Sequence, residues 1–302
     1  MLLGDSAHTA HFSIGSGTKL AMEDATALVE AFQAHGQADI PATLAAYQEA
    51  RRVDVIKLQK AAQTSLEWFE NAARYVHQTP AQFQFNLMTR SKRITYENLR
   101  LRDPDLVRQT DEEFRKAQDA ELASDGVPAP PAFTPIHVGG LELANRIVVS
   151  PMCQYSATDG LADDWHMVHL ASRALGGAGL VITEMTDVSA DGRITLGCTG
   201  LYTDEHAAAW KRIVDFVHSH TQAKIGIQLA HAGRKGSTSH DWENDDVPLT
   251  EGGWQTIGPD ARPFLPDWPA PKQMDRADMD RVRDEFVAAV RRADEAGFDL
   301  LE

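Results

Sequence analysis

The sequence predicts an α/β protein, in which a mainly helical segment precedes a partial (β/α)8 barrel of about three and a half βα units. After residue 133, short apolar runs rich in β-branched residues alternate with amphipathic helical patterns. Before residue 123, apolar residues recur at helical spacing instead. A stretch at 123–132 that contains one Gly and three Pro residues separates the two patterns and excludes a continuous helix.

In the first segment, apolar residues from Leu20 to Phe32 follow helical spacing and stop at Gly36, a residue suited to a helix C-terminus. A second helix is predicted from Pro41, which is favoured in a first helical turn, to about Val76. We therefore expect the segment before the linker to be mainly helical.

In the second segment, four short runs predict strands, and three amphipathic patterns between them predict helices. The strands are expected at 147–149, 180–182, 225–227 and 298–301, and the helices around 167–175, 210–217 and 279–290. The last helix should end at Gly297. Such alternation is typical of parallel βα units. An eight-fold barrel takes about 250 residues, so we expect a piece of a longer polypeptide, truncated at both ends.

Composition narrows the class of protein. The 302 residues are 43% hydrophobic and 24% charged, which is typical of a packed globular protein. The net charge of −15 argues against nucleic acid or an anionic membrane as partner, because both attract basic surfaces. Two cysteines, Cys153 and Cys198, fit neither a disulfide framework nor a zinc site. Without a signal peptide or a long apolar run, we expect a cytoplasmic protein.

Side chains capable of chemistry follow three of the predicted strands, where the active sites of parallel barrels lie. They are Pro151, Met152, Cys153 and Tyr155 after the first strand, Glu184 and Met185 after the second, and Gln228, His231 and Arg234 after the third. Polar residues also cap strands for structural reasons. A thiol, a phenol, an amide and an imidazole–guanidinium pair at three exits favour a functional site.

Six longer motifs lie in the same region. They are FTPI at 133–136, NRI at 145–147, SPMCQY at 150–155, DGR at 191–193, TDEH at 203–206 and IQLAHAGRK at 227–235. Together they resemble the old yellow enzyme family of FMN-dependent reductases, in particular its branch with a cysteine beside the flavin. The resemblance covers essentially all of 133–302.

The resemblance implies roles for the residues at the first strand exit. Main chain around Pro151 and Met152 would line the isoalloxazine, and Cys153 would tune its potential, since a nearby thiol perturbs the electronics of the ring. Tyr155 would face the substrate, so that Cys153 and Tyr155 form the catalytic pair.

At the other exits, Met185 would border the ring and Gln228 would hydrogen-bond its pyrimidine edge, where an amide can both donate and accept. His231 and Arg234 would contact substrate or an interface. Hydride would pass from NAD(P)H to FMN and then to the β-carbon of an electron-poor alkene or ring. The family's substrate-binding histidine pair and FMN phosphate site would lie beyond Glu302.

The opening residues carry a second pattern, with LGDSAH at 3–8, GSG at 15–17 and EDA at 23–25, ahead of an amphipathic helix. It resembles the second flavin-contacting motif of FAD-dependent aromatic hydroxylases. The resemblance implies that Asp5 holds the ribityl chain of FAD. Gly15 and Gly17 would open a helix whose N-terminal amides face the flavin. The same glycines are also common in turns.

A hydroxylase segment joined to a reductase segment resembles the fused 2-aminobenzoyl-CoA monooxygenase/reductase and salicylyl-CoA 5-hydroxylase family. Residues 1–122 would be the C-terminal part of an FAD-binding hydroxylase domain, 123–132 a linker, and 133–302 the N-terminal part of an FMN-binding barrel. The implied function is a bifunctional aromatic-CoA monooxygenase and FMN-dependent reductase of aromatic compound degradation. The full-length protein would take an aromatic CoA thioester as substrate and form a homo-oligomer.

Two alternatives remain open. The chain could be a stand-alone FMN-dependent NADPH dehydrogenase that reduces enones, with the first 127 residues as a structural arm. It could also be a non-catalytic, incomplete barrel that serves as an interaction module. The stretch 232–277 would be a substrate cover or a subunit contact. The choice between NADH and NADPH is left open by the sequence.

The remaining titratable residues have structural explanations that we favour. The pairs His8/His11 and His166/His169 are each three residues apart and could share a metal in a helix, but nothing completes either ligand set, and we expect no metal. Glu184 could act as a general base, but a carboxylate satisfied by main chain or arginine is the preferred interpretation.

Overall fold

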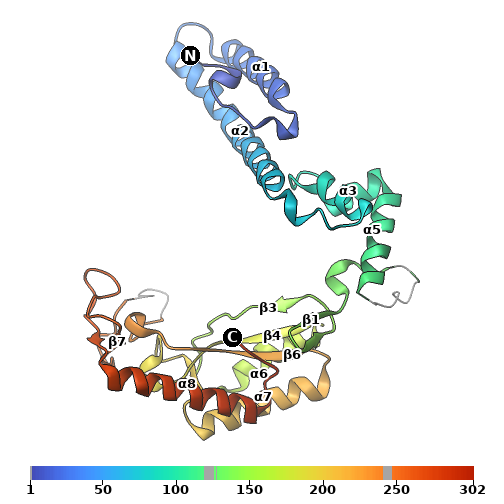
Figure 1. Cartoon of the computed structure of the whole chain (residues 1–302). Coiled ribbons are helices and arrows are strands. Elements are labelled where there is room, and N and C mark those ends of the chain that lie inside the picture. The colour runs from blue at the N-terminus through green and yellow to red at the C-terminus, as the bar shows by residue number, and fades with distance from the viewer. Residues whose placement is uncertain (1, 119–125, 127, 241–246) are drawn as a thin grey trace. The chain divides into compact units, whose positions relative to one another are not determined.

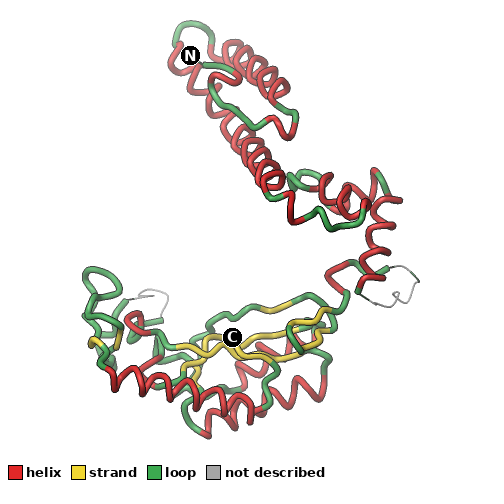
Figure 2. The backbone as a smooth tube through the Cα atoms, in the orientation of Figure 1, coloured by secondary structure: helices red, strands yellow, loops and turns green. Residues whose placement is uncertain are grey.

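The computed structural model describes residues 2–118, 126, 128–240 and 247–302. The chain divides into two compact units, Met1–Ala117 and Gln118–Glu302, which are described in turn. The first unit is built of helices and the second combines helices with strands (Figure 2). Part of the predicted linker at 123–132 lies outside the described residues.

The first unit contains five α-helices and three short 3-10 turns among its described residues. The helices are α1 (Gly17–His35), α2 (Ile40–Glu70), α3 (Pro80–Thr89), α4 (Tyr96–Arg102) and α5 (Pro104–Ala117). The prediction that the second helix reaches Val76 is wrong. The Asn71 side chain donates to the Glu67 carbonyl at 2.7 Å, and the chain then turns through a 3-10 helix at Ala72–Arg74.

A buried charge cluster joins α1, α2 and the opening residues. Asp24 on α1 is fully buried and its Oδ1 accepts from Arg51 Nε of α2 at 2.8 Å. Its Oδ2 lies 2.8 Å from His8 Nε2 and accepts from the Gly4 amide at 3.2 Å. A second Arg51 nitrogen binds Glu23. Because a buried carboxylate without a partner is costly, this cluster fixes three segments against one another.

We expect Arg51→Met to lower the free energy of unfolding of the first unit by about 3–5 kcal/mol, because it leaves the buried Asp24 carboxylate without its cation. Arg52→Met is the matched control. The Arg52 side chain is 66% exposed, and its change should cost about 1 kcal/mol or less. Urea denaturation followed by circular dichroism measures both. Equal costs for the two variants would contradict the importance of the cluster.

The second unit is an α/β fold around a parallel sheet. Its strands β3 (Val148–Val149), β4 (Leu180–Asp187), β6 (Lys224–Ala230) and β9 (Leu300–Leu301) pair in that order, and all are parallel. The helices α6 (Asp164–Leu175), α7 (Asp204–His220) and α8 (Arg276–Ala296) connect successive strands. The strand and helix predictions for this segment are therefore confirmed, with β4 extending five residues beyond the predicted 180–182 run.

The three helices lie on one face of the sheet. Helix α7 packs against both α6 and α8, and Figure 1 shows all three on the same side of the strands. Sequential strand order with helices on one face is the arrangement of a (β/α) barrel, whereas a doubly wound sheet carries helices on both faces. Within the part of the chain that the structure describes, β3 and β9 are the outer strands of this sheet and do not pair with each other.

The two faces of the sheet are buried by different partners. Trp210, Ile213 and Val217 of α7 pack on the helix side, together with Val181 and Ile225 of the strands. The opposite face of β4 packs against a hairpin formed by β1 (Ile136–Val138) and β2 (Leu141–Leu143), through the cluster of Leu143, Leu180 and Ile182. The carboxyl ends of the strands are thereby left for other contacts.

Three short strands complete the unit. Strand β5 (Thr199–Gly200) pairs with the end of β4, and β7 (Ile257–Gly258) pairs with β8 (Lys272–Gln273) inside the long stretch that follows β6. No helix among the described residues has the length and apolar character needed to cross a bilayer.

Candidate functional site

A change of register between β4 and β6 shapes the carboxyl end of the sheet. Ile182 pairs with Gly226 and Met185 pairs with Gln228, so three steps along β4 match two along β6. The additional residue forms a β-bulge, which reverses the alternation of side chains. Met185 therefore shares the face of Ile182 and Gln228, whereas in a regular strand it would point towards the helices.

Cys153 reaches the same place from the end of β3. Its thiol contacts the backbone of Met185 and the side chain of Tyr155. Burial first, and the negative charge of Glu184 second, raise the pKa of the Cys153 thiol. The structure thus brings Cys153, from the segment after β3, and Gln228, on β6, to Met185 on the strand between β3 and β6.

Tyr155 is held in a constrained backbone conformation. Its φ of 49° lies in the left-handed region, which is uncommon for a residue with a side chain. The loop at Gly197 packs against it, and a Cβ at position 197 would stand 2.4 Å from the Tyr155 carbonyl oxygen. The Ala157 amide also donates to the Gly197 carbonyl at 3.0 Å. Strain that the surroundings enforce is common at functional sites.

Pro151 and Met152 form the loop between β3 and Cys153. The Met152 carbonyl accepts from the Gln154 side chain at 2.8 Å, and the Met152 side chain is 48% exposed. The Met152 side chain lines a cavity of about 400 Å³ beside α6. The other lining residues are Gln154, Trp165, Val168, His169 and Arg173.

The predicted site residues on and after β6 contact other parts of the chain. The Gln228 side chain donates to Glu302 Oε1 at 3.0 Å. His231 Nδ1 accepts from the Gly233 amide at 3.0 Å, and burial lowers the pKa of His231, so its ring is neutral at pH 7. Arg234 binds Asp260 and the Arg262 carbonyl, and so anchors the long loop after β6.

In the first unit, the structure places Asp5, Gly15 and Gly17 around the start of α1. Gly15 has a φ of 62° and ends a 3-10 turn, and Gly17 is the first residue of the helix. A Cβ on Gly17 would lie 3.9 Å from Asp5 Oδ1. The carboxylate of Asp5 is thus next to the helix N-terminus.

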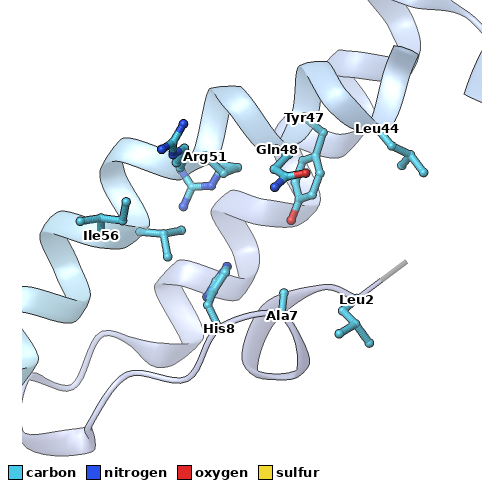
Figure 3. A pocket seen from close by; sticks show the side chains of 10 residues that line it. Leu2, Ala7, His8, Leu44, Tyr47, Gln48, Arg51 and Ile56 are labelled. Atoms are coloured by element: carbon cyan, nitrogen blue, oxygen red, sulfur yellow. The ribbon is translucent and has the colours of Figure 1, made fainter. Parts of the chain in front are cut away.

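A separate cavity of about 480 Å³ lies between α2 and the opening residues (Figure 3). Leu2, His8, Tyr47, Arg51 and Ile56 are among the side chains that surround it. Its lining includes none of the three residues around the start of α1.

The histidines that are spaced three residues apart have separate partners. His8 contacts Asp24, whereas His11 accepts from the Ser13 amide. His166 contacts Asp163 and Glu184. Across residues 2–118, 126, 128–240 and 247–302, no group of three or more His, Cys, Asp or Glu side chains is arranged to hold a metal.

Comparison with known proteins defines the family. Residues 131–302 match the model of the NADH:flavin oxidoreductase / NADH oxidase family, and the chain belongs to that family. An NADH:flavin oxidoreductase of Gibberella zeae is 39% identical over 194 residues, which are 63% of this chain and 47% of that protein. An NADPH dehydrogenase of Geobacillus sp. is 41% identical over 172 residues, which are 56% of this chain and 46% of that protein.

Among solved structures, an old yellow enzyme from Pichia sp. AKU4542 is similar with a TM-score of 0.49 and 26% identity, over 57% of this chain and 45% of that chain. The chain spans about half the length of the curated relatives it matches. The family match begins at residue 131. The hydroxylase interpretation of residues 1–122 therefore rests on the sequence motif and on the geometry around Asp5.

We expect Gly197→Ala to lower the free energy of unfolding of the second unit by about 1–3 kcal/mol, because the new methyl group would collide with the main chain of Tyr155. Gly140→Ala is the control. A Cβ at Gly140 has nothing within 4 Å, so this change should cost far less. Thermal and urea denaturation of both variants tests the difference, and equal stabilities would show that the Gly197 loop yields freely.

Proposed function

We propose that the second unit forms the flavin-facing part of an NAD(P)H-dependent oxidoreductase that uses FMN. The observation that carries this proposal is the meeting of Cys153, Met185 and Gln228 at the carboxyl ends of adjacent parallel strands. Membership of the NADH:flavin oxidoreductase / NADH oxidase family supports it. The names of the Gibberella and Geobacillus relatives agree with the same class of reaction.

The residues around Met185 fit the chemistry of an FMN ring. The Gln228 amide can donate to and accept from the pyrimidine edge, and Cys153 offers a polarizable, protonated thiol. Main chain at Pro151 and Met152 would border the ring. When bound, FMN supplies a two-electron carrier between NAD(P)H and a second substrate. Tyr155, next to Cys153, would orient that substrate through its phenol.

The proposal extends to substrate and setting. The second substrate would be an enone or another electron-poor alkene, which accepts hydride at its β-carbon. We further propose a cytoplasmic, homo-oligomeric protein. The net charge of −15 disfavours nucleic acid as a partner.

A second candidate function concerns the first unit. Asp5 lies beside the N-terminus of α1 at Gly17, where its carboxylate would accept from the hydroxyl groups of a ribityl chain while the first amides of the helix would face the flavin. This supports an FAD-dependent hydroxylase segment, and with it the fused monooxygenase and reductase of aromatic CoA thioesters. Flavins extracted from the native protein distinguish the two candidates. Equal amounts of FAD and FMN would support the fusion, and FMN alone would support the stand-alone reductase.

We expect Gln228→Leu to weaken FMN binding by about tenfold, because the ring would lose hydrogen bonds at its pyrimidine edge. Quenching of flavin fluorescence in a titration of the chain with FMN measures the change. Gln222→Leu, at an exposed position just before the same strand, should leave the affinity unaltered. An unchanged affinity in Gln228→Leu would remove Gln228 from the site.

A further inference from the structure

We infer that Glu184 is a positioning residue for Cys153, and that a relay of Asp163 and His166 holds Glu184 in place from the protein surface. The inference rests on the proposed function, because it matters most where the Cys153 thiol faces a flavin. The contacts that carry it belong to this chain alone and can be tested without a flavin.

The relay is a continuous series of polar contacts. His166 Nδ1 lies 2.8 Å from Asp163 Oδ1, and His166 Nε2 lies 3.1 Å from Glu184 Oε1. The second contact is an ion pair when His166 is protonated, and its geometry is not that of a hydrogen bond. Glu184 Oε2 accepts from the Gln154 amide at 2.8 Å. The series therefore ends at the residue that directly follows Cys153.

The β-bulge explains why the Glu184 side chain can reach His166. Ile182 and Met185 share the inner face of the sheet, so the additional residue between them turns Glu184 towards α6. His166 stands on the first turn of α6, where Asp163 is the N-cap residue and accepts from the Trp165 amide at 2.9 Å. Sheet and helix thus present the carboxylate and the imidazole to each other in a buried space.

Burial and the neighbouring carboxylates have opposite effects on the pKa of His166. Burial alone would lower the pKa of His166, but its contacts with Glu184 and Asp163 outweigh burial and raise it above the ordinary value. His166 Nδ1 accepts from the Asp163 amide at 3.0 Å when it carries no proton, and on protonation it donates to Asp163 Oδ1 while the positive charge balances Glu184. Asp163 is the accessible end, because its side chain is 55% exposed.

Glu184 acts on Cys153 in two ways. Its hydrogen bond to the Gln154 amide fixes the backbone beside the thiol. Its negative charge disfavours the thiolate and so raises the pKa of Cys153. A positive charge on His166 balances the charge of Glu184 and thereby lowers the pKa of the thiol. The other titratable groups nearby are Asp187 close to Cys153, and His169 close to both Glu184 and His166.

The test is the rate at which iodoacetamide alkylates Cys153 between pH 7 and pH 10 in the flavin-free chain, with peptide mass mapping to separate it from the buried Cys198. The reactive species is the thiolate. Glu184→Gln keeps an acceptor for the Gln154 amide and removes the charge. We expect its pH profile to move to lower pH and its rate at pH 8 to rise about threefold to tenfold.

Asp163→Asn should have the opposite effect. Asparagine caps a helix as well as aspartate does, so α6 keeps its N-terminus while His166 loses a charged partner. With less positive charge on His166, Glu184 acts more strongly, and alkylation between pH 7 and pH 8 should slow by about twofold. Asp164→Asn, next along the chain and 84% exposed, is the matched control and should leave the rate unchanged.

The double variant Glu184→Gln/Asp163→Asn shows whether the relay acts through Glu184. We expect it to behave as Glu184→Gln does. Two results would overturn the inference. One is an effect of Asp163→Asn that persists in the Glu184→Gln background, and the other is a pH profile of thiol alkylation that neither change moves. If Glu184→Gln does not fold, Asp163→Asn decides alone, and an unchanged rate with a native circular dichroism spectrum overturns it.

These results are independent of those for the proposed function. Alkylation that follows the expected pattern, together with a native protein that yields no FMN, would overturn the proposed function and keep the positioning of Cys153. FMN binding with an unresponsive thiol would do the reverse.

Discussion

The register shift between β4 and β6 is the constraint on which the arrangement of the second unit depends. In a regular strand, the side chain that follows Ile182 by three positions would point towards the helices. The bulge places Met185 beside Gln228 instead, and it sends Glu184 to the helix side, where His166 meets it. One additional residue in β4 thus places Met185 in the inner site and its neighbour Glu184 in the buried contact with His166.

Each unit buries a carboxylate that contacts a basic side chain. Asp24 is paired with Arg51 and His8, and Glu184 with His166. In both cases main-chain amides, those of Gly4 and Gln154, take up the remaining oxygen capacity. Such groups cost stability if a partner is lost, so they fix the relative position of the segments that supply them. In the second unit, the segment so fixed carries the Cys153 thiol.

The sequence predicts much of this structure because strong periodic patterns determine it. The strands of the sheet, helices α6 to α8 and the end of α8 at Gly297 follow from apolar spacing and glycine placement. Helices α3 and α4 have weak periodicity, although Thr79 with Gln82 and Thr95 with Asn98 form capping boxes that signal their starts. The bulge and the Glu184–His166 contact depend on pairing between segments distant in sequence, which local patterns do not encode.

The close approach of the Gly197 loop to Tyr155 has a consequence for how this family member can diversify. Because main chain fills the space beside position 197, any side chain there would collide with the backbone of Tyr155 at a cost in stability. Mutations that move the Tyr155 phenol would therefore occur at neighbouring side chains. One such neighbour is His240, whose ring centroid is 5.9 Å from that of Tyr155. Evolutionary change around this tyrosine would come from the long loop after β6, while the turn that fixes its backbone stays constant.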